Sequence, residues 1–137
     1  MKRIANATWN GNLKEGNGTF SVSSGAFTNQ KFSFKTRFED APGTNPEELI
    51  AAAHAACFSM ALSAQLGERG ITPQAVETTS TITFEAGTLK VSALTTTVRA
   101  PGADKAKVEE AAAAAKAGCP ISKVLKLEIT LALTVVT

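Results

Sequence analysis

Two cysteines are the side chains of this sequence best suited to chemistry. Cys57 lies within a long apolar run, residues 49–62, and Cys119 lies between Gly118 and Pro120. Glycine commonly ends a helix and proline commonly begins one, so Cys119 is expected at a helix start. There the backbone N–H groups and the helix dipole favour a thiolate. Two such thiols in a chain without a secretion signal indicate redox chemistry rather than a structural disulfide.

Each cysteine also has a purely structural interpretation. Cys57, surrounded by alanines and Phe58, could be an inert core residue, because burial raises the pKa of a thiol. A nearby cation would be needed to make it reactive. Cys119 could simply fill a turn.

His54 precedes Cys57 by three residues, so the two side chains are expected on one face of a helix. That spacing would allow a Cys–His dyad or a shared metal ion. The sequence contains 1 His, whereas a zinc site needs about four ligands at short spacings. We therefore predict that His54 is a packed, hydrogen-bonded helix residue and that the protein uses no metal and no cofactor.

Composition places further limits on the protein. The 137 residues, 44% hydrophobic and 19% charged, suit one domain over residues 1–137, and the net charge of +2 is too small to indicate nucleic acid or a membrane surface. No apolar stretch of signal-peptide length follows the basic residues near the start. The apolar run 49–64 is shorter than the ~20 residues of a membrane span. We expect a cytoplasmic protein with no nucleic-acid and no membrane partner.

Glycine, asparagine and proline positions divide the chain into the elements that would hold these residues. Asn45 is the expected cap of a long helix that ends at Gly67 or Gly70. Strands are expected over residues 4–9, 19–22, 31–39, 76–85, 89–100 and 128–136, and further helices over 103–117 and 120–126. The order predicts an α+β fold with antiparallel sheets packed around two central helices. Because the first helix is apolar all round, we expect it to be buried on every side, in a homodimer.

Four segments together resemble the osmotically inducible protein C (OsmC) family, which is related to the organic hydroperoxide resistance proteins. They are Thr-Arg-Phe-Glu at 36–39, Gly-Thr-Asn-Pro-Glu-Glu-Leu-Ile at 43–50, Ala-Ala-His-Ala-Ala-Cys-Phe-Ser-Met at 52–60, and Lys-Ala-Gly-Cys-Pro-Ile-Ser-Lys-Val-Leu at 116–125. The resemblance runs from the first expected strand to the last. His54 and Arg37 favour the OsmC branch.

The resemblance implies an intertwined homodimer and a thiol-dependent peroxidase that reduces organic hydroperoxides and hydrogen peroxide in oxidative and osmotic stress defence. It implies that Cys57 is the peroxidatic thiol, that Cys119 resolves it, and that Arg37 and Glu47 complete the site. Arg37 would hold Cys57 as a thiolate and Glu47 would orient the guanidinium. A dithiol such as a lipoyl group is the implied reductant.

Two consequences of these assignments concern geometry and electrostatics. Helix context favours Cys119 as the better thiolate. The resemblance, which makes Cys57 the attacking thiol, therefore requires Arg37 to make Cys57 the more readily ionised of the two. Glu47 and Cys57 are ten residues apart on one expected helix, hence about 15 Å apart along its axis. An arginine that reaches Cys57 would not reach Glu47 of the same chain, which predicts a site shared across a dimer.

A non-enzymatic carrier of apolar ligands, or a redox sensor, is the alternative function. In a carrier the cysteines would be core residues only. Rapid, stoichiometric loss of both thiols on addition of a hydroperoxide would separate the two classes.

Overall fold

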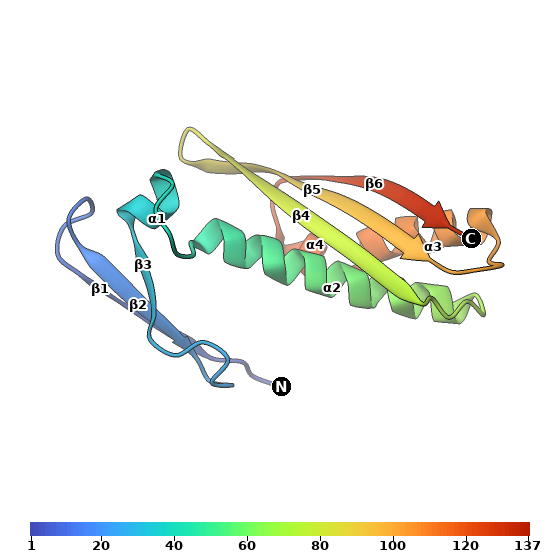
Figure 1. The fold of residues 1–137 in the computed structure, drawn as a ribbon, viewed down its shortest axis with the longest axis horizontal. Helices are drawn as coiled ribbons and strands as arrows, with labels where there is room; N and C mark the ends of the chain where they lie inside the picture. Colours follow the sequence, from blue (N-terminus) through green and yellow to red (C-terminus); the bar gives the residue numbers. More distant parts are fainter. The chain divides into compact units, whose positions relative to one another are not determined.

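The computed structural model describes residues 1–137 and divides the chain into two compact units, Met1–Leu49 and Ile50–Thr137 (Figure 1). The expectation of a single domain over the whole chain stays a prediction. The long helix α2, Pro46–Glu68, begins in the first unit and continues into the second.

The first unit is built on a three-stranded antiparallel sheet in the order β1-β2-β3, with bounds Ala5–Asn10, Asn17–Val22 and Gln30–Ser33. Aromatic side chains pack together on it. The ring of Phe32 lies 5.5 Å from that of Trp9, centroid to centroid, and 6.1 Å from that of Phe20. These contacts fix the pairing of the strands, because each ring comes from a different strand.

The strand predicted over residues 31–39 is wrong beyond Ser33. A short helix, α1, occupies Phe34–Phe38. The Ser33 hydroxyl accepts a hydrogen bond from the Thr36 backbone N–H at 3.3 Å, and the Thr36 hydroxyl accepts one from the Ser33 N–H at 2.9 Å. This reciprocal cap starts a helix where the alternating phenylalanines suggested a strand. Arg37 is therefore a helix residue.

Helix α2 begins at the predicted cap, where the Asn45 side-chain oxygen accepts the Glu48 backbone N–H at 2.8 Å. The second of the two expected glycines ends it. Gly70 has a φ of +72°, and the following Ile71 N–H bonds to the Leu66 carbonyl at 2.9 Å. Only a left-handed residue at this position allows that closing bond, which is why glycine is found there.

The second unit contains the sheet β4-β5-β6, with bounds Ala75–Glu85, Thr88–Arg99 and Glu128–Val136. β4 and β5 are antiparallel, as expected, but β6 is parallel to β5. Parallel neighbours need a crossover connection. Helices α3, Lys105–Gly118, and α4, Pro120–Val124, form that crossover. The prediction of entirely antiparallel sheets is thus corrected, whereas the α+β class is confirmed.

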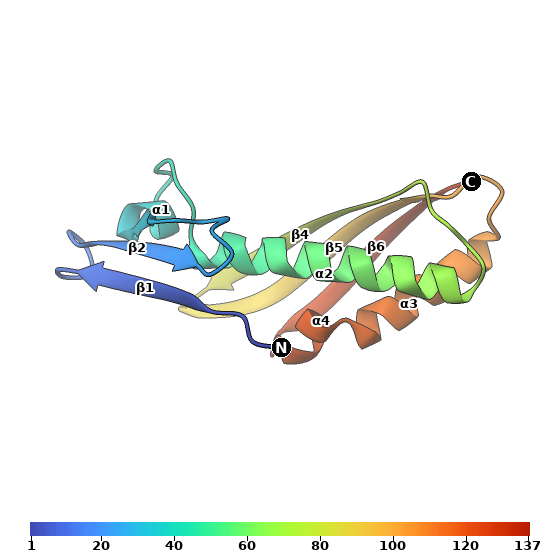
Figure 2. The ribbon, with the colours of Figure 1, turned by 90° about the horizontal axis from the view of Figure 1, so that it is seen from below.

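Helices α2 and α3 lie against one face of the β4-β5-β6 sheet (Figures 1 and 2). The core between these layers is apolar and continuous, and it includes one of the two cysteines. Its members are Phe58, Leu62, Leu66, Leu94, Val98, Ala100, Val108, Ala111, Ala112, Ala115 and Cys119. Burial of this set supplies the main stabilisation of the second unit.

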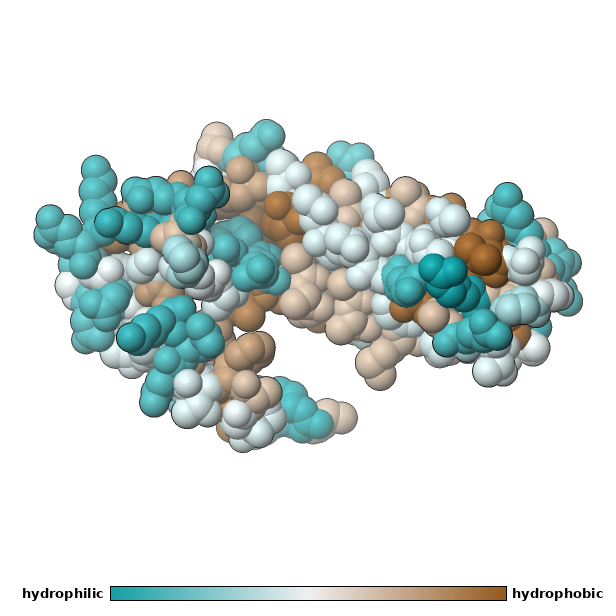
Figure 3. Space-filling model, in the orientation of Figure 1, coloured by the Kyte–Doolittle hydropathy of each residue, from teal (hydrophilic) through white to brown (hydrophobic).

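The single chain buries one side of α2, so the burial of α2 on every side in a homodimer stays a prediction. Its buried residues form one stripe with a spacing of four, namely His54, Phe58, Leu62 and Leu66. Met60, on another side of the helix, is 75% exposed. The space-filling view shows apolar surface, in tan, along the exposed side of α2 (Figure 3). One side of an apolar helix is therefore left without protein cover.

By length and composition alone, α2 is long and apolar enough to cross a membrane, with its 23 residues. The central helix of a protein in water also passes that test when its apolar surface is packed against other elements. The helix is longer than the uncharged run 49–64, because the capped first turn and the residues up to Glu68 also belong to it.

Candidate active site

The two cysteines meet in the second unit. Cys57 belongs to α2 and Cys119 lies between α3 and α4; both are free thiols, and each shifts the pKa of the other. Cys119 has no exposed surface, whereas Cys57 is partly exposed. Of the two cysteines, Cys57 is therefore the one that a molecule from solvent can approach.

The backbone of Cys119 links two helices. Its N–H donates to the Ala115 carbonyl at 2.8 Å and so closes α3, and its carbonyl accepts from the Lys123 N–H at 3.1 Å and so opens α4. Pro120 follows as the first residue of α4, where its missing N–H costs nothing. The predicted position of Cys119 at a helix start is thus confirmed.

The surroundings shift the pKa values of the two thiols in opposite directions. Burial raises the pKa of Cys119, but the backbone N–H groups of Ser122 and Ile121, the Ser122 hydroxyl and the Cys57 thiol outweigh it, and the pKa is lowered overall. Burial also raises the pKa of Cys57; the Ile121 backbone N–H offsets part of this, and the neighbouring Cys119 raises the pKa further. Within one chain, Cys119 is the better thiolate, as its context predicted.

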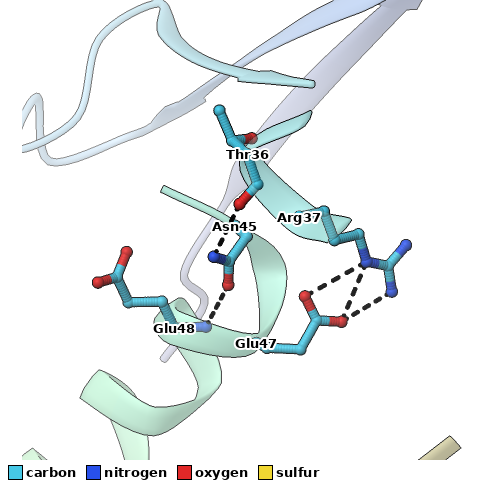
Figure 4. Close-up of polar contacts among 5 residues, drawn as sticks. All are labelled: Thr36, Arg37, Asn45, Glu47 and Glu48. Atoms are coloured by element: carbon cyan, nitrogen blue, oxygen red, sulfur yellow. Dashed lines mark hydrogen bonds and ion pairs between the residues drawn. The ribbon is translucent and has the colours of Figure 1, made fainter. Parts of the chain in front are cut away.

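Arg37 and Glu47 form the second pair, within the first unit. The guanidinium is forked onto the carboxylate, with Nη2 donating to Oε1 at 2.8 Å and Nε donating to the same oxygen at 3.1 Å (Figure 4). The guanidinium carbon also lies 5.1 Å from the centre of the Phe38 ring. Two planar contacts orient the cation, which a lysine could not reproduce.

Asn45 connects the helices that carry this ion pair. Its side-chain N–H donates to the Thr36 carbonyl of α1 at 3.1 Å, while its oxygen caps α2 (Figure 4). The sequence predicted the cap but not the bond to α1. The acidic side chain of Glu48 accepts from the Thr44 hydroxyl at 2.7 Å.

Arg37 borders an apolar recess in the first unit, with a volume of about 260 Å³. Half of its lining residues are aromatic, namely Trp9, Phe32, Phe34 and Phe38, and Leu13 and Pro46 add further apolar surface. The recess combines one cation with walls suited to a hydrocarbon group.

His54 is a packed residue rather than a partner of Cys57. It is completely buried, its Nδ1 lies 2.6 Å from the Ser92 hydroxyl, and its Nε2 lies 2.8 Å from the Ser122 hydroxyl. Burial lowers its pKa, so the imidazole is neutral at neutral pH. The hydrogen-bonded interpretation is confirmed, and the sequence did not reveal the two serines because they come from distant elements. No group of three or more His, Cys, Asp or Glu side chains is arranged to hold a metal ion.

The family model for OsmC-like proteins matches residues 38–134. Peroxiredoxin OsmC of Escherichia coli K12 is 51% identical over 129 residues, which cover 91% of this chain and 90% of that protein. The chain belongs to the OsmC-like family. Peroxiredoxin OsmC of Shigella flexneri gives the same identity and coverage.

Solved structures agree with this assignment. The organic hydroperoxide resistance protein OhrB of Bacillus subtilis has a TM-score of 0.67 and 27% identity, over 96% of this chain and 98% of that one. An OsmC-like protein from Mycoplasma pneumoniae has a TM-score of 0.77 over 100% and 99% of the two chains. At 17% identity, the second likeness concerns the fold. The OsmC-like resemblance read from the sequence is confirmed, and the protein is a cysteine-based peroxidase by homology.

The role of Asn45 in this OsmC-like protein is testable with two substitutions. Asn45→Ala removes both the cap and the bond to Thr36, and should lower the free energy of unfolding by about 1 kcal/mol. Asn45→Asp keeps the capping oxygen but loses the N–H donor, so stability should be retained. We expect both variants to reduce peroxide more slowly than the wild type, because α1 carries Arg37. Full activity in Asn45→Asp would show that the Thr36 bond does not position the arginine.

The buried His54 makes stability depend on pH in a defined direction. Its pKa is held below the ordinary value of 6.5, so below that pH the unfolded chain takes up a proton that the folded chain does not. The free energy of unfolding should therefore fall as the pH drops below 6.5, by at most about 1.4 kcal/mol per pH unit. Denaturant titrations at several pH values measure this slope. The matched His54→Asn variant, which leaves the chain without histidine, should lose it; an equal slope in both proteins would contradict the assignment.

Proposed function

We propose that the protein reduces organic hydroperoxides and hydrogen peroxide in the cytoplasm, with Cys57 as the peroxidatic and Cys119 as the resolving thiol. The observation that carries this proposal is the pairing of two free thiols that shift each other's pKa, one partly exposed and packed against the core that contains the other, which is completely buried. The exposed sulfur receives the peroxide, and the buried one is already within reach of the product.

The reaction has two steps on these sulfurs. The Cys57 thiolate attacks the distal oxygen of the hydroperoxide, the O–O bond breaks, and an alcohol leaves after its alkoxide takes a proton; Cys57 becomes a sulfenic acid. The Cys119 thiolate then attacks the Cys57 sulfur, an S–S bond forms, and hydroxide leaves as water after taking a proton. A dithiol reductant, for which a lipoyl group is suited, returns both cysteines to thiols by exchange.

Activation of Cys57 requires a cation, because its own chain raises its pKa. Arg37 is the candidate, and it is held by Glu47 of the same chain. Glu47 and Cys57 lie on one uninterrupted helix, about 15 Å apart along its axis. An Arg37 bound in this way is better placed to serve the thiols of a second chain than its own.

We therefore propose a homodimer in which two α2 helices pair antiparallel and each Arg37–Glu47 pair serves the thiols of the partner subunit. The uncovered apolar side of α2, with Met60 75% exposed, supports this arrangement because such a surface favours association. The apolar recess beside Arg37 supports organic hydroperoxides as substrates. The site is still shared between two chains, as predicted from the sequence. Arg37 and Glu47 now come from the same chain, and Cys57 and Cys119 come from its partner.

Mapping of the oxidised protein tests the thiol assignment. After one equivalent of cumene hydroperoxide, we expect a peptide pair joined by an intramolecular Cys57–Cys119 disulfide, and the loss of two thiols per chain. Cys119→Ser should stop at the sulfenic acid of Cys57, and Cys57→Ser should consume almost no peroxide. Intermolecular bridges alone, or unchanged thiols, would contradict the proposal and favour the carrier.

Mixed dimers test the shared site. Inactive Arg37→Ala chains and inactive Cys57→Ser chains should together regain activity after subunit exchange, because one of the two sites then combines intact thiols with an intact ion pair. Arg37→Ala mixed with Glu47→Ala is the matched control and should stay inactive, since no site has both members of the pair. If confirmed mixed dimers of the first kind stay inactive, the site is not shared.

A further inference from the structure

A chain of buried hydroxyl groups ends beside the thiol pair. His54 of α2 lies between Ser92 of β5 and Ser122 of α4, at 2.6 and 2.8 Å, and the Ser92 oxygen lies 3.1 Å from that of Ser80 on β4. His54 and Ser92 have no exposed surface, and Ser122 is 8% exposed. Apolar residues could fill this space without the cost of burying polar groups, so the network calls for a reason other than packing.

The network reaches the resolving thiol through Ser122. This serine lies three residues after Cys119, in the first turn of α4 that Cys119 begins, and the interaction of its hydroxyl with the thiol lowers the pKa of Cys119. The same hydroxyl group contacts His54 Nε2. Ser122 thus stands between the imidazole and the sulfur.

The number of donors and acceptors on each group determines which way the hydrogen bonds of this network run. A neutral imidazole donates from one nitrogen and accepts at the other. A Ser122 hydroxyl that donates to a thiolate must itself accept, so the proton of His54 is on Nε2. Nδ1 then accepts from the Ser92 hydroxyl, and Ser92 accepts from Ser80. Each donor in the chain is oriented toward the Cys119 sulfur.

We propose that His54 and Ser122 are positioning residues for the resolving step, in which the Nε2–H of His54 holds the Ser122 hydroxyl as a donor to the Cys119 thiolate. The inference rests on the proposed role of Cys119. When Cys119 attacks the sulfenic acid of Cys57, its negative charge passes to the leaving hydroxide, so a donor fixed on the sulfur keeps the attacking group ionised until the S–S bond forms. His54 acts through Ser122 and does not touch the reacting atoms.

The charged groups near Ser122 do not account for the lowered pKa of Cys119. The charged side chains that line a cleft with Ser122 are Lys116 of α3 and Lys123 of α4. The Cys57 thiol is the titratable group that contacts Cys119. Neither lysine is among the groups that shift the pKa of Cys119 or of His54.

Rapid mixing with one equivalent of cumene hydroperoxide separates the two chemical steps. We expect Ser122→Ala to slow disulfide formation by about ten-fold more than it slows peroxide consumption, in proportion to the loss of one hydrogen bond to a charged group. Sulfenic acid on Cys57 should then accumulate and be trapped by dimedone. Ser122→Thr, which keeps the hydroxyl, should restore the rate. Equal slowing of both steps, or no slowing, would overturn the proposal.

Two substitutions of His54 provide a matched pair. The amide nitrogen of His54→Gln can reach the place of Nε2 and donate to Ser122, whereas His54→Asn reaches only the place of Nδ1. Disulfide formation should be largely retained in the first variant and slowed in the second. Nitrogen NMR of the reduced protein should show the Nε2–H tautomer; the Nδ1–H tautomer would overturn the proposed direction.

A titration without peroxide separates this inference from the proposed function. In a Cys57→Ser background, the thiolate absorbance of Cys119 should appear at a higher pH when Ser122 is also replaced by alanine, and an unchanged titration would overturn the inference. If the wild type consumes no peroxide, the proposed function fails, but this measurement still decides whether Ser122 stabilises the thiolate.

Discussion

The two backbone hydrogen bonds of Cys119 are the interaction on which the rest of the site depends. One closes α3 onto the Ala115 carbonyl and the other opens α4 from the Lys123 N–H. Because both bonds belong to the main chain, they fix the direction of the Cys119 side chain whatever the charge on its sulfur. The buried stripe of α2 packs into the same core, so Cys57 is held against that sulfur by the packing that stabilises the second unit.

Exposure to solvent favours Cys57 as the attacking thiol, whereas ionisation favours Cys119. Which cysteine attacks depends on whether a partner group changes the ionisation of Cys57. Exposure favours Cys57 and is set by the packing of α2. Ionisation favours Cys119 within one chain, but a guanidinium near Cys57 would reverse that order, since the interaction of two opposite charges in a partly buried site amounts to several kcal/mol. The peroxidatic role that we propose for Cys57 therefore agrees with its partly exposed position and needs a cation that its own thiol environment does not supply. The forked contact of Arg37 with Glu47 holds such a cation ready.

The sequence was sufficient where a local rule determines the structure. Asn45 as a cap and Cys119 at a helix start are short-range features that were predicted, and Gly70 was one of the two glycines predicted to end α2. The helix that carries Arg37 was missed because the reciprocal Ser33–Thr36 cap outweighs an alternating aromatic pattern. The parallel strand β6 was missed because alternation gives the buried face of a strand but not its direction. The composition of α2 predicted burial on every side in a homodimer, and the single chain shows only which side is covered within the chain.

The parallel pairing of β5 and β6 has a consequence for the oxidised protein. The crossover that carries Cys119 is tied at both ends to one sheet, so it has little freedom to move when the disulfide forms. If the proposed Cys57–Cys119 disulfide forms, we expect the reduced and oxidised states to have nearly the same backbone. The new bond then acts mainly on the unfolded chain, which it closes into a loop from Cys57 to Cys119. In the chain-entropy account, a loop of that size raises the free energy of unfolding by about 4 kcal/mol. The same free energy makes the disulfide harder to reduce in the folded protein than in the unfolded chain, so the fold itself contributes to the reduction potential that a dithiol reductant must match.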